Sequence, residues 1–307
     1  MAEYRLLNNV FTGAKLGSLF QDATFFHLHD ADEGCYFEWA DGDRVVASVH
    51  FTPTGEGLWR SPARGTFAGF AFHSELRTED LFAFYDAVEV ALKEKGAQRI
   101  EVLPAPMAHD STAFANQFYL LRARDFQITH CDLNQSLNVD AGSLLDRMTY
   151  GNQKRLRKCQ REGLEALQLP LSALPEVYEV LAANRKSNGH VLSMTVAQLQ
   201  TMIDTFPTAV VLFGVKDGDR LAAAAVCLWV SSKILYVLYW GDRLGYASHS
   251  PVVPLANAIY IYCQALGAEV IDVGTSTLDR QQNYGLIQFK RGLGFTESLK
   301  VRMSKNL

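Results

Sequence analysis

The sequence lacks long hydrophobic runs and has no large excess of charge of either sign. No apolar run reaches the about 18 residues that a membrane-spanning helix needs, and the first residues, MAEYRLLNNVF, lack the basic-then-apolar pattern of a signal peptide. The net charge of −4 over 307 residues argues against a DNA-coating protein, although it leaves room for a local basic groove. We therefore expect a cytoplasmic protein with no membrane span and no DNA partner.

Cysteine is scarce and scattered, and the common catalytic signatures are missing. The five cysteines include no CxxC pair, which favours reduced thiols over disulfides or a zinc site. His27 and His29 stand close together, but no third ligand is spaced with them, so we expect no metal. GxSxG, HExxH and P-loop motifs are absent as well. The sequence therefore offers no motif for a serine hydrolase, a zinc protease or a P-loop nucleotide-binding protein.

What the sequence does contain is an internal repeat. Three pairs of segments recur in the same order: DGDR at 41–44 and 217–220, LKEKGAQRIEV at 92–102 and CQALGAEVIDV at 263–273, and RARDF at 122–126 with a fainter GLGF at 292–295. The offset is nearly constant at roughly 170 residues, which indicates one fold used twice. We expect two domains, 1–139 and 140–307, with the boundary at residues 140–143.

Hydrophobic patterning predicts similar elements in the two halves, because DGD between apolar runs is a strong hairpin signal. For the second half it predicts strands at 209–216, 221–230 and 234–240, a helix at 252–266, a strand at 270–273, a helix at 283–293 and a strand at 295–303. For the first half it predicts strands within 35–51, a helix at 78–95, a strand at 99–103, a helix at 111–122 and a strand from 126. Helices are expected between the repeats at 142–163, 174–188 and 195–206, with Thr195 capping the last. The fold class is α/β (α+β), a largely antiparallel mixed sheet flanked by helices in each half.

In the second half, this order of elements resembles the GNAT acyltransferase fold. Many GNAT enzymes carry Asn-x-x-small-x-x-Leu-Tyr-x-x-x-Gly-Phe on the helix after the fifth strand. The matching positions here are Asn283, Leu286, Phe289, Lys290, Gly294 and Phe295. The usual Tyr, often the general acid of these enzymes, is replaced by Lys290. The replacement points to one branch of the superfamily.

That branch is the Fem-type peptidyltransferases and related tandem-GNAT acyltransferases. FKRGLG at 289–294 resembles their Phe-Lys-x-x-Phe-Gly signature. IDVGTS at 271–276, SPVVPL at 250–255 and the basic helix NQKRLRKCQREGL at 152–164 are also similar to that group. The resemblance covers the whole chain as an architecture, but its specific motifs lie within residues 150–296.

The chain also departs from both patterns. The GNAT pyrophosphate loop reads Arg/Gln-x-x-Gly-x-Gly/Ala, whereas 242–247 keeps the Gly and Ala but begins with Asp242. The charged helical hairpin with which some Fem enzymes grip tRNA is absent. In the first half, Leu121 and Asp125 occupy the acid and glycine positions. The first half is therefore expected to have no chemistry of its own and to shape the acceptor site.

The resemblance implies a set of site residues, each with a structural alternative. Lys290 and Asn283 would be catalytic, although Lys290 could instead reach solvent along the edge of the core and Asn283 could cap its helix. The cofactor-binding candidates are Tyr239, Trp240, Asp242, Arg243, Gly245 and Ala247, which could equally be core aromatics and a plain loop. The substrate-binding candidates are Arg64, Thr275 and Ser276, which could equally be loop and turn residues. The stripe Lys154, Arg157, Lys158 and Arg161 could meet phosphates or simply be solvated.

The function implied is transfer of an acyl group from acetyl-CoA or a longer acyl-CoA to an amine on a small molecule or peptide. One alternative is a Fem-like transferase that takes an amino acid from aminoacyl-tRNA and adds it to a peptide or cell-wall precursor. Lys290 and the basic helix favour that alternative, whereas the mild acidity and the missing hairpin oppose it. The second alternative is a non-catalytic ligand-binding protein that retains the double fold.

Overall fold

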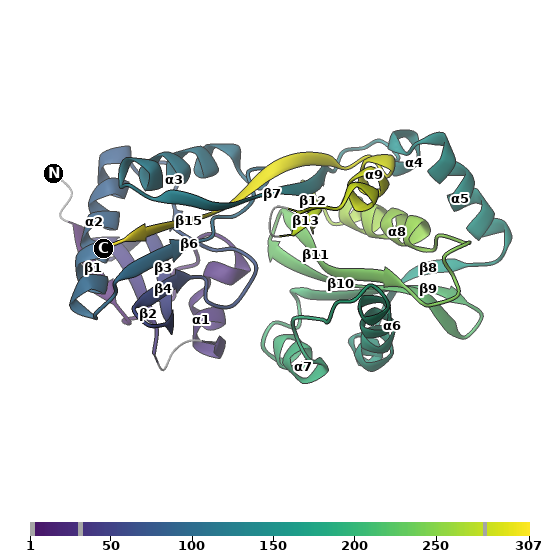
Figure 1. Cartoon of the computed structure of the whole chain (residues 1–307), viewed down its shortest axis with the longest axis horizontal. Helices are drawn as coiled ribbons and strands as arrows, with labels where there is room; N and C mark the ends of the chain where they lie inside the picture. Colours follow the sequence, from purple (N-terminus) through teal and green to yellow (C-terminus); the bar gives the residue numbers. More distant parts are fainter. Residues whose placement is uncertain (1–3, 30–32, 279–280) are drawn as a thin grey trace. The chain divides into compact units, whose positions relative to one another are not determined.

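The computed structural model describes residues 4–29, 33–278 and 281–307, and these form two compact units (Figure 1). Unit 1 comprises residues 1–133, 277–281 and 298–307, and unit 2 comprises 134–276 and 282–297. Strand β7 (Gln127–Asn138) begins in unit 1 and ends in unit 2, while β15 (Thr296–Asn306) begins in unit 2 and ends in unit 1. The predicted division into two duplicated domains, 1–139 and 140–307, differs from these units in its bounds and stays a prediction.

Unit 1 is a sheet covered by helices. Its strands run in the order β1 (Tyr4–Asn8), β2 (Cys35–Asp41), β3 (Arg44–Gly55), β4 (Leu58–Ser61), β6 (Arg99–Val102) and β15, with β5 (Ala71–Phe72) paired to β3. Neighbouring strands are antiparallel except β4 and β6, which are parallel. The helices are α1 (Ala23–His29), which carries His27 and His29, α2 (Thr78–Glu94) and α3 (Ser111–Ala123). Apolar side chains of α2, α3 and one sheet face form the core of this unit.

Unit 2 is also a mixed sheet covered by helices. Its strands run in the order β7, β12 (Val270–Thr275), β11 (Ile234–Asp242), β10 (Arg220–Ser231), β9 (Val210–Asp217) and β8 (Glu165–Leu169). Its helices are α4 (Leu144–Arg147), α5 (Tyr150–Arg161), α6 (Leu174–Ser187), α7 (Val196–Thr205), α8 (Val252–Ala265) and α9 (Tyr284–Gly292). Figure 1 shows α8 and α9 on one face of this sheet and α6 and α7 on the other. Strands β13 (Thr277–Leu278) and β14 (Gln281–Gln282), which pair with each other, follow β12 in the sequence.

The fold class and the meander predicted for the second half are confirmed. Both DGD segments are two-residue hairpin turns, between β2 and β3 and between β9 and β10. Gly42 and Gly218 each have φ +59°, the left-handed conformation that such a turn needs and that glycine adopts without strain. Thr195 caps α7 as predicted, because its side chain accepts from the amide of Gln198.

One predicted helix is wrong in a way that has a clear cause. Residues 142–163 form α4 and α5 rather than one helix, because Met148 and Thr149 adopt extended backbone angles between them. The Thr149 amide and hydroxyl both donate to the carbonyl oxygen of Gly292 at the end of α9. This contact joins residues far apart in sequence, so local patterning gives no sign of it.

Within the described residues, no helix is long and apolar enough to cross a membrane.

Candidate active site

The site begins where two parallel strands of unit 2 separate. Strands β11 and β12 pair over only three positions, and the last pair is Tyr236 with Asp272. Both strands continue past that pair, since β11 stays paired with β10 as far as Asp242. The β10–β11 ladder is itself irregular here, because Val237 and Tyr239 oppose neighbouring residues of β10 and Leu238 is the extra residue of a bulge. Beyond Tyr236, the edge of β11 that faces β12 is therefore no longer paired to it.

Lys290 holds the end of β12. It lies in the last turn of α9 with only 1% of its surface exposed, so it does not reach solvent along the edge of the core. Its Nζ donates to the carbonyl oxygens of Gly274 at 2.9 Å and Thr275 at 3.1 Å. Gly274 has φ +71°, a conformation that turns the chain as it leaves the strand.

Burial changes the protonation of this lysine. Loss of hydration lowers the pKa of Lys290 to about 7, the Asp272 carboxylate opposes that shift, and Arg185 adds to it. At neutral pH, both the ammonium and the free amine are therefore populated. A group with its pKa near the working pH is suited to exchanging protons or stabilising charge during a reaction.

A buried polar network surrounds the same strand end, and sequence reasoning missed most of it. Asp272 is fully buried, and its Oδ1 accepts from Asn134 Nδ2 at 2.9 Å and from the Gly274 amide at 2.7 Å. Asn134 Oδ1 is buried and has no hydrogen-bond partner among the residues that the structure describes. One feature of the sequence could have indicated this network: Asp272 is a charged residue inside the otherwise apolar run 270–273.

Ser276 belongs to this network rather than to an open surface. It is 2% exposed, and its hydroxyl donates to Gln135 Oε1 at 2.5 Å. Gln135 Nε2 in turn donates to the Ile287 carbonyl oxygen of α9 and to Glu297. Thr275 is half-buried and contributes its carbonyl oxygen to Lys290.

Asn283 makes the contacts of a helix cap. Its side-chain oxygen accepts from the Leu286 amide at 2.9 Å, which satisfies a donor in the first turn of α9. The backbone N–H of Asn283 donates to the carbonyl oxygen of Ser276 at 3.2 Å. Asn283 therefore ties the start of α9 to the end of β12, and its catalytic role stays a prediction.

The side chains that begin the predicted phosphate loop are engaged in holding it. Asn184 Nδ2 on α6 donates to both the carbonyl and the carboxylate oxygen of Asp242, each at 2.9 Å. Arg243 donates to the Leu221 carbonyl oxygen at 2.8 Å and to Glu179 at 3.0 Å. These contacts fix the loop to α6 and β10, and cofactor binding by Asp242 and Arg243 stays a prediction.

The backbone of the loop after Arg243 carries free donors. Among the described residues, the amides of Gly245, Ala247 and Ser248 find no hydrogen-bond acceptor. Gly245 has φ +95°, and a methyl group built on it would meet no described atom within 4 Å. Helix α8 starts a few residues later at Val252 without a side-chain cap at Pro251. Unpaired amides next to the start of a helix are an arrangement that suits an anion.

The two aromatic candidates at the end of β11 are packed on opposite faces of the sheet. Tyr239 is 6% exposed, and its hydroxyl lies 2.5 Å from Ser193 Oγ in the segment between α6 and α7. The Trp240 ring lies 6.3 Å from that of Phe289 on α9 and 6.2 Å from that of Phe295. Both residues lie in the part of β11 that no longer pairs with β12, and their contact with a cofactor stays a prediction.

Arg64 lies in unit 1, in an exposed loop, whereas every other predicted site residue is in unit 2. Unit 2 brings Lys290, Thr275, Ser276 and Asn283 together at the end of β12. It places Tyr239, Trp240 and the loop from Asp242 to Ala247 along and after β11.

Within the described part of the chain, no group of three or more His, Cys, Asp or Glu residues is placed to hold a metal ion.

No protein-family model and no curated protein matches this sequence. Solved structures do match it. FemX aligns at a TM-score of 0.74 with 14% identity, over 96% of this chain and 94% of that chain. The C-terminal domain of a putative lysylphosphatidylglycerol synthetase from Agrobacterium fabrum aligns at 0.60 with 12% identity, over 94% and 88%. A tandem GNAT protein from the clavulanic acid biosynthesis pathway aligns at 0.52 with 12% identity, over 99% and 98%. The chain therefore has the fold of the Fem-type and tandem-GNAT proteins.

Proposed function

We propose that unit 2 transfers an acyl group from acyl-CoA to an amine acceptor. The observation that carries the proposal is the separation of β11 from β12 after Tyr236, next to the buried Lys290 at the end of β12. Backbone groups freed from a ladder can hydrogen-bond a substrate inserted between the strands. A pantetheine arm is narrow and carries two amides, so it fits such a gap.

The reaction needs no covalent enzyme intermediate. The amine nitrogen attacks the thioester carbonyl carbon, a C–N bond forms, the C–S bond breaks, and the proton lost by the amine ends on the departing thiol. An ammonium group has three N–H donors, and two of those of Lys290 are used on Gly274 and Thr275. The third would stabilise negative charge on the carbonyl oxygen as the transition state forms.

The unpaired amides before α8 support a CoA donor. Gly245, Ala247 and Ser248 would bind its pyrophosphate, with the dipole of α8 adding to the attraction. The tandem GNAT protein of the same fold is described as a form without AcCoA, which associates that protein with this class of donor.

Calorimetric titration with acetyl-CoA and longer acyl-CoAs tests the donor. Ala247→Pro removes one of the proposed pyrophosphate donors and should weaken binding at least tenfold, whereas Ala247→Gly keeps the amide and should bind like the wild type. Circular dichroism controls for folding. Failure of every acyl-CoA to bind the wild type contradicts the proposal.

A Fem-like transferase is the second candidate, in which aminoacyl-tRNA replaces acyl-CoA and a peptide is the acceptor. The extent of the alignment with FemX favours it. So does α5, where Arg157 and Arg161 form no ion pair among the described residues and Lys154 lies 4.3 Å from the ring centre of the exposed Tyr150. If the protein transfers an amino acid from charged tRNA to a peptide and uses no acyl-CoA, its donor is aminoacyl-tRNA. Binding of a donor without transfer to any acceptor would instead support the non-catalytic alternative.

A further inference from the structure

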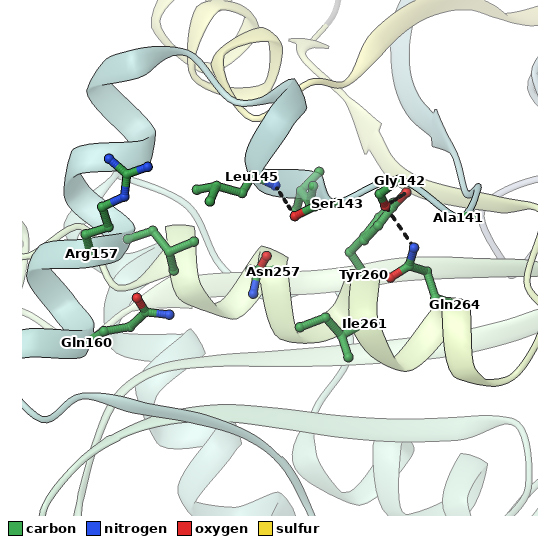
Figure 2. Close-up of a pocket in the computed structure, with 12 residues that line it drawn as sticks. Ala141, Gly142, Ser143, Leu145, Arg157, Gln160, Asn257, Tyr260, Ile261 and Gln264 are labelled. Carbon is green, nitrogen blue, oxygen red and sulfur yellow. Dashed lines mark hydrogen bonds between the residues drawn. The ribbon is translucent and has the colours of Figure 1, made fainter.

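Unit 2 also contains a cavity away from the separated ends of β11 and β12. It has a volume of about 380 Å³, opens to solvent, and is lined by residues of 141–143, α4, α5 and α8. Figure 2 shows Gln160 reaching from α5 towards α8 and Asn257 rising from α8 between the two helices. Neither Lys290 nor the loop before α8 lines it. Its size falls in the range of small-molecule pockets in proteins, about 300–1,000 Å³.

One wall of the cavity is fixed by hydrogen bonds. The Tyr260 hydroxyl donates to the carbonyl oxygen of Gly142 at 3.1 Å, and Gln264 Nε2 donates to the same oxygen at 2.8 Å. Gln264 also bonds the carbonyl oxygen of Asp140. The segment 140–142 is therefore held against α8 before any ligand arrives, and a wall formed in advance reduces the ordering cost of binding.

Three further polar side chains line the cavity, two on α5 and one on α8, and they are exposed or half-buried. Arg157, Gln160 and Asn257 make no hydrogen bond or ion pair with any described residue, whereas Lys158, also on α5, pairs with Glu162. Arg157 is the one cation among the lining residues, which include no acidic side chain. The rest of the lining is largely apolar and includes Leu145 and Ile261. The lining thus combines one positive charge, two free carboxamides and a short apolar surface.

We propose that this cavity binds a small organic anion. Arg157 would pair with a carboxylate or phosphate group, which its planar guanidinium matches with two parallel hydrogen bonds. Gln160 and Asn257 each offer a donor and an acceptor to hydroxyl or amide groups on the ligand. Leu145 and Ile261 accommodate a short apolar part. This proposal is independent of the acyl-CoA donor, because none of these residues belongs to the site at β11 and β12.

Calorimetry on the full chain tests the proposal with two anions, succinate and glycerol 3-phosphate, and with their neutral counterparts, succinamide and glycerol. We expect saturable one-site binding of at least one anion and none of either neutral molecule. The anion that binds identifies the carboxylate or the phosphate source. Arg157→Gln should weaken the affinity at least tenfold.

Arg161→Gln is the matched control, because it removes the same charge from the same helix without altering the lining. It should leave the anion affinity within twofold of the wild type. Ile261→Trp, which fills the cavity and keeps Arg157, should also abolish binding. The proposal is overturned if neither anion binds, or if Arg157→Gln and Arg161→Gln weaken binding equally.

Discussion

The ammonium nitrogen of Lys290 lies 2.9 Å from the carbonyl oxygen of Gly274, and this bond joins the last turn of α9 to the end of β12. A buried ammonium is costly unless hydrogen bonds replace its water, and here two backbone carbonyls do so. The sequence motif around Lys290 thus has a structural consequence. It positions a titratable cation where β12 no longer pairs with β11.

Replacing this lysine tests its role in the reaction. Lys290→Met keeps a straight chain of similar volume but removes the charge, so we expect turnover to fall at least tenfold while the protein remains folded. Stability at pH 7 should not fall, because the loss of the donor to Gly274 and Thr275 is offset by removal of the cost of burying the ammonium. Turnover of an acyl-CoA with a panel of amines measures the first effect, and urea unfolding measures the second. Unchanged turnover would remove Lys290 from the active site.

The same lysine should make stability depend on pH above neutrality. Burial lowers its pKa to about 7 in the folded state, against an ordinary value of 10.5 in the unfolded chain. Between these values, the unfolded chain binds the extra proton, so unfolding becomes less favourable as pH rises. The contribution is up to about 1.4 kcal/mol per pH unit. Urea unfolding at pH 7 and 8.5 should show a steeper rise for the wild type than for Lys290→Met, and parallel curves would contradict the burial effect.

His50 should act in the acid range. It is fully buried in unit 1, with Nε2 2.8 Å from the Phe20 carbonyl oxygen, and burial lowers its pKa to about 4 from an ordinary 6.5. The unfolded chain therefore takes up a proton first as pH falls. Stability should be full above pH 6.5 and decline towards pH 4, by about 3 kcal/mol in total. His50→Gln should flatten that decline, whereas an unchanged slope would assign the acid sensitivity to other groups.

Two substitutions separate the capping role of Asn283 from a catalytic one. Asn283→Ala removes the acceptor for the Leu286 amide and should lower stability by about 1 kcal/mol. Asn283→Asp retains a cap acceptor. We therefore expect its unfolding equilibrium constant and its turnover rate each to remain within threefold of the wild-type value. A variant Asn283→Asp that is fully stable yet inactive would show that the amide contacts substrate.

Local patterns predicted the parts of the fold that depend on neighbouring residues. The hairpins at Gly42 and Gly218 follow from turn chemistry, and the Thr195 cap follows from its sequence context. The interruption at Met148 and Thr149 was not predictable, because it depends on a carbonyl of Gly292 that lies far along the chain.

The site divides in the same way. A family motif selected Lys290, but its burial depends on the carbonyls of β12, and the pairing of Asn134 with Asp272 joins two strands that are distant in sequence. Arg243 was predicted to bind the cofactor; its Nε donates to Leu221 and one terminal nitrogen to Glu179, contacts that the sequence did not indicate, and its cofactor contact stays a prediction. Sequence gives the residue types at a site, whereas their availability depends on tertiary contacts.

Hydrogen–deuterium exchange with and without acetyl-CoA tests the central claim most directly. The free amides of Gly245, Ala247 and Ser248 should exchange fast in the unliganded protein, because no described residue accepts from them. Saturating acetyl-CoA should slow exchange at these amides and along 237–241 of β11, and Ala247→Pro should weaken that protection. Acetyl-CoA that binds without protecting either segment, or that protects only peptides of unit 1, would contradict the account.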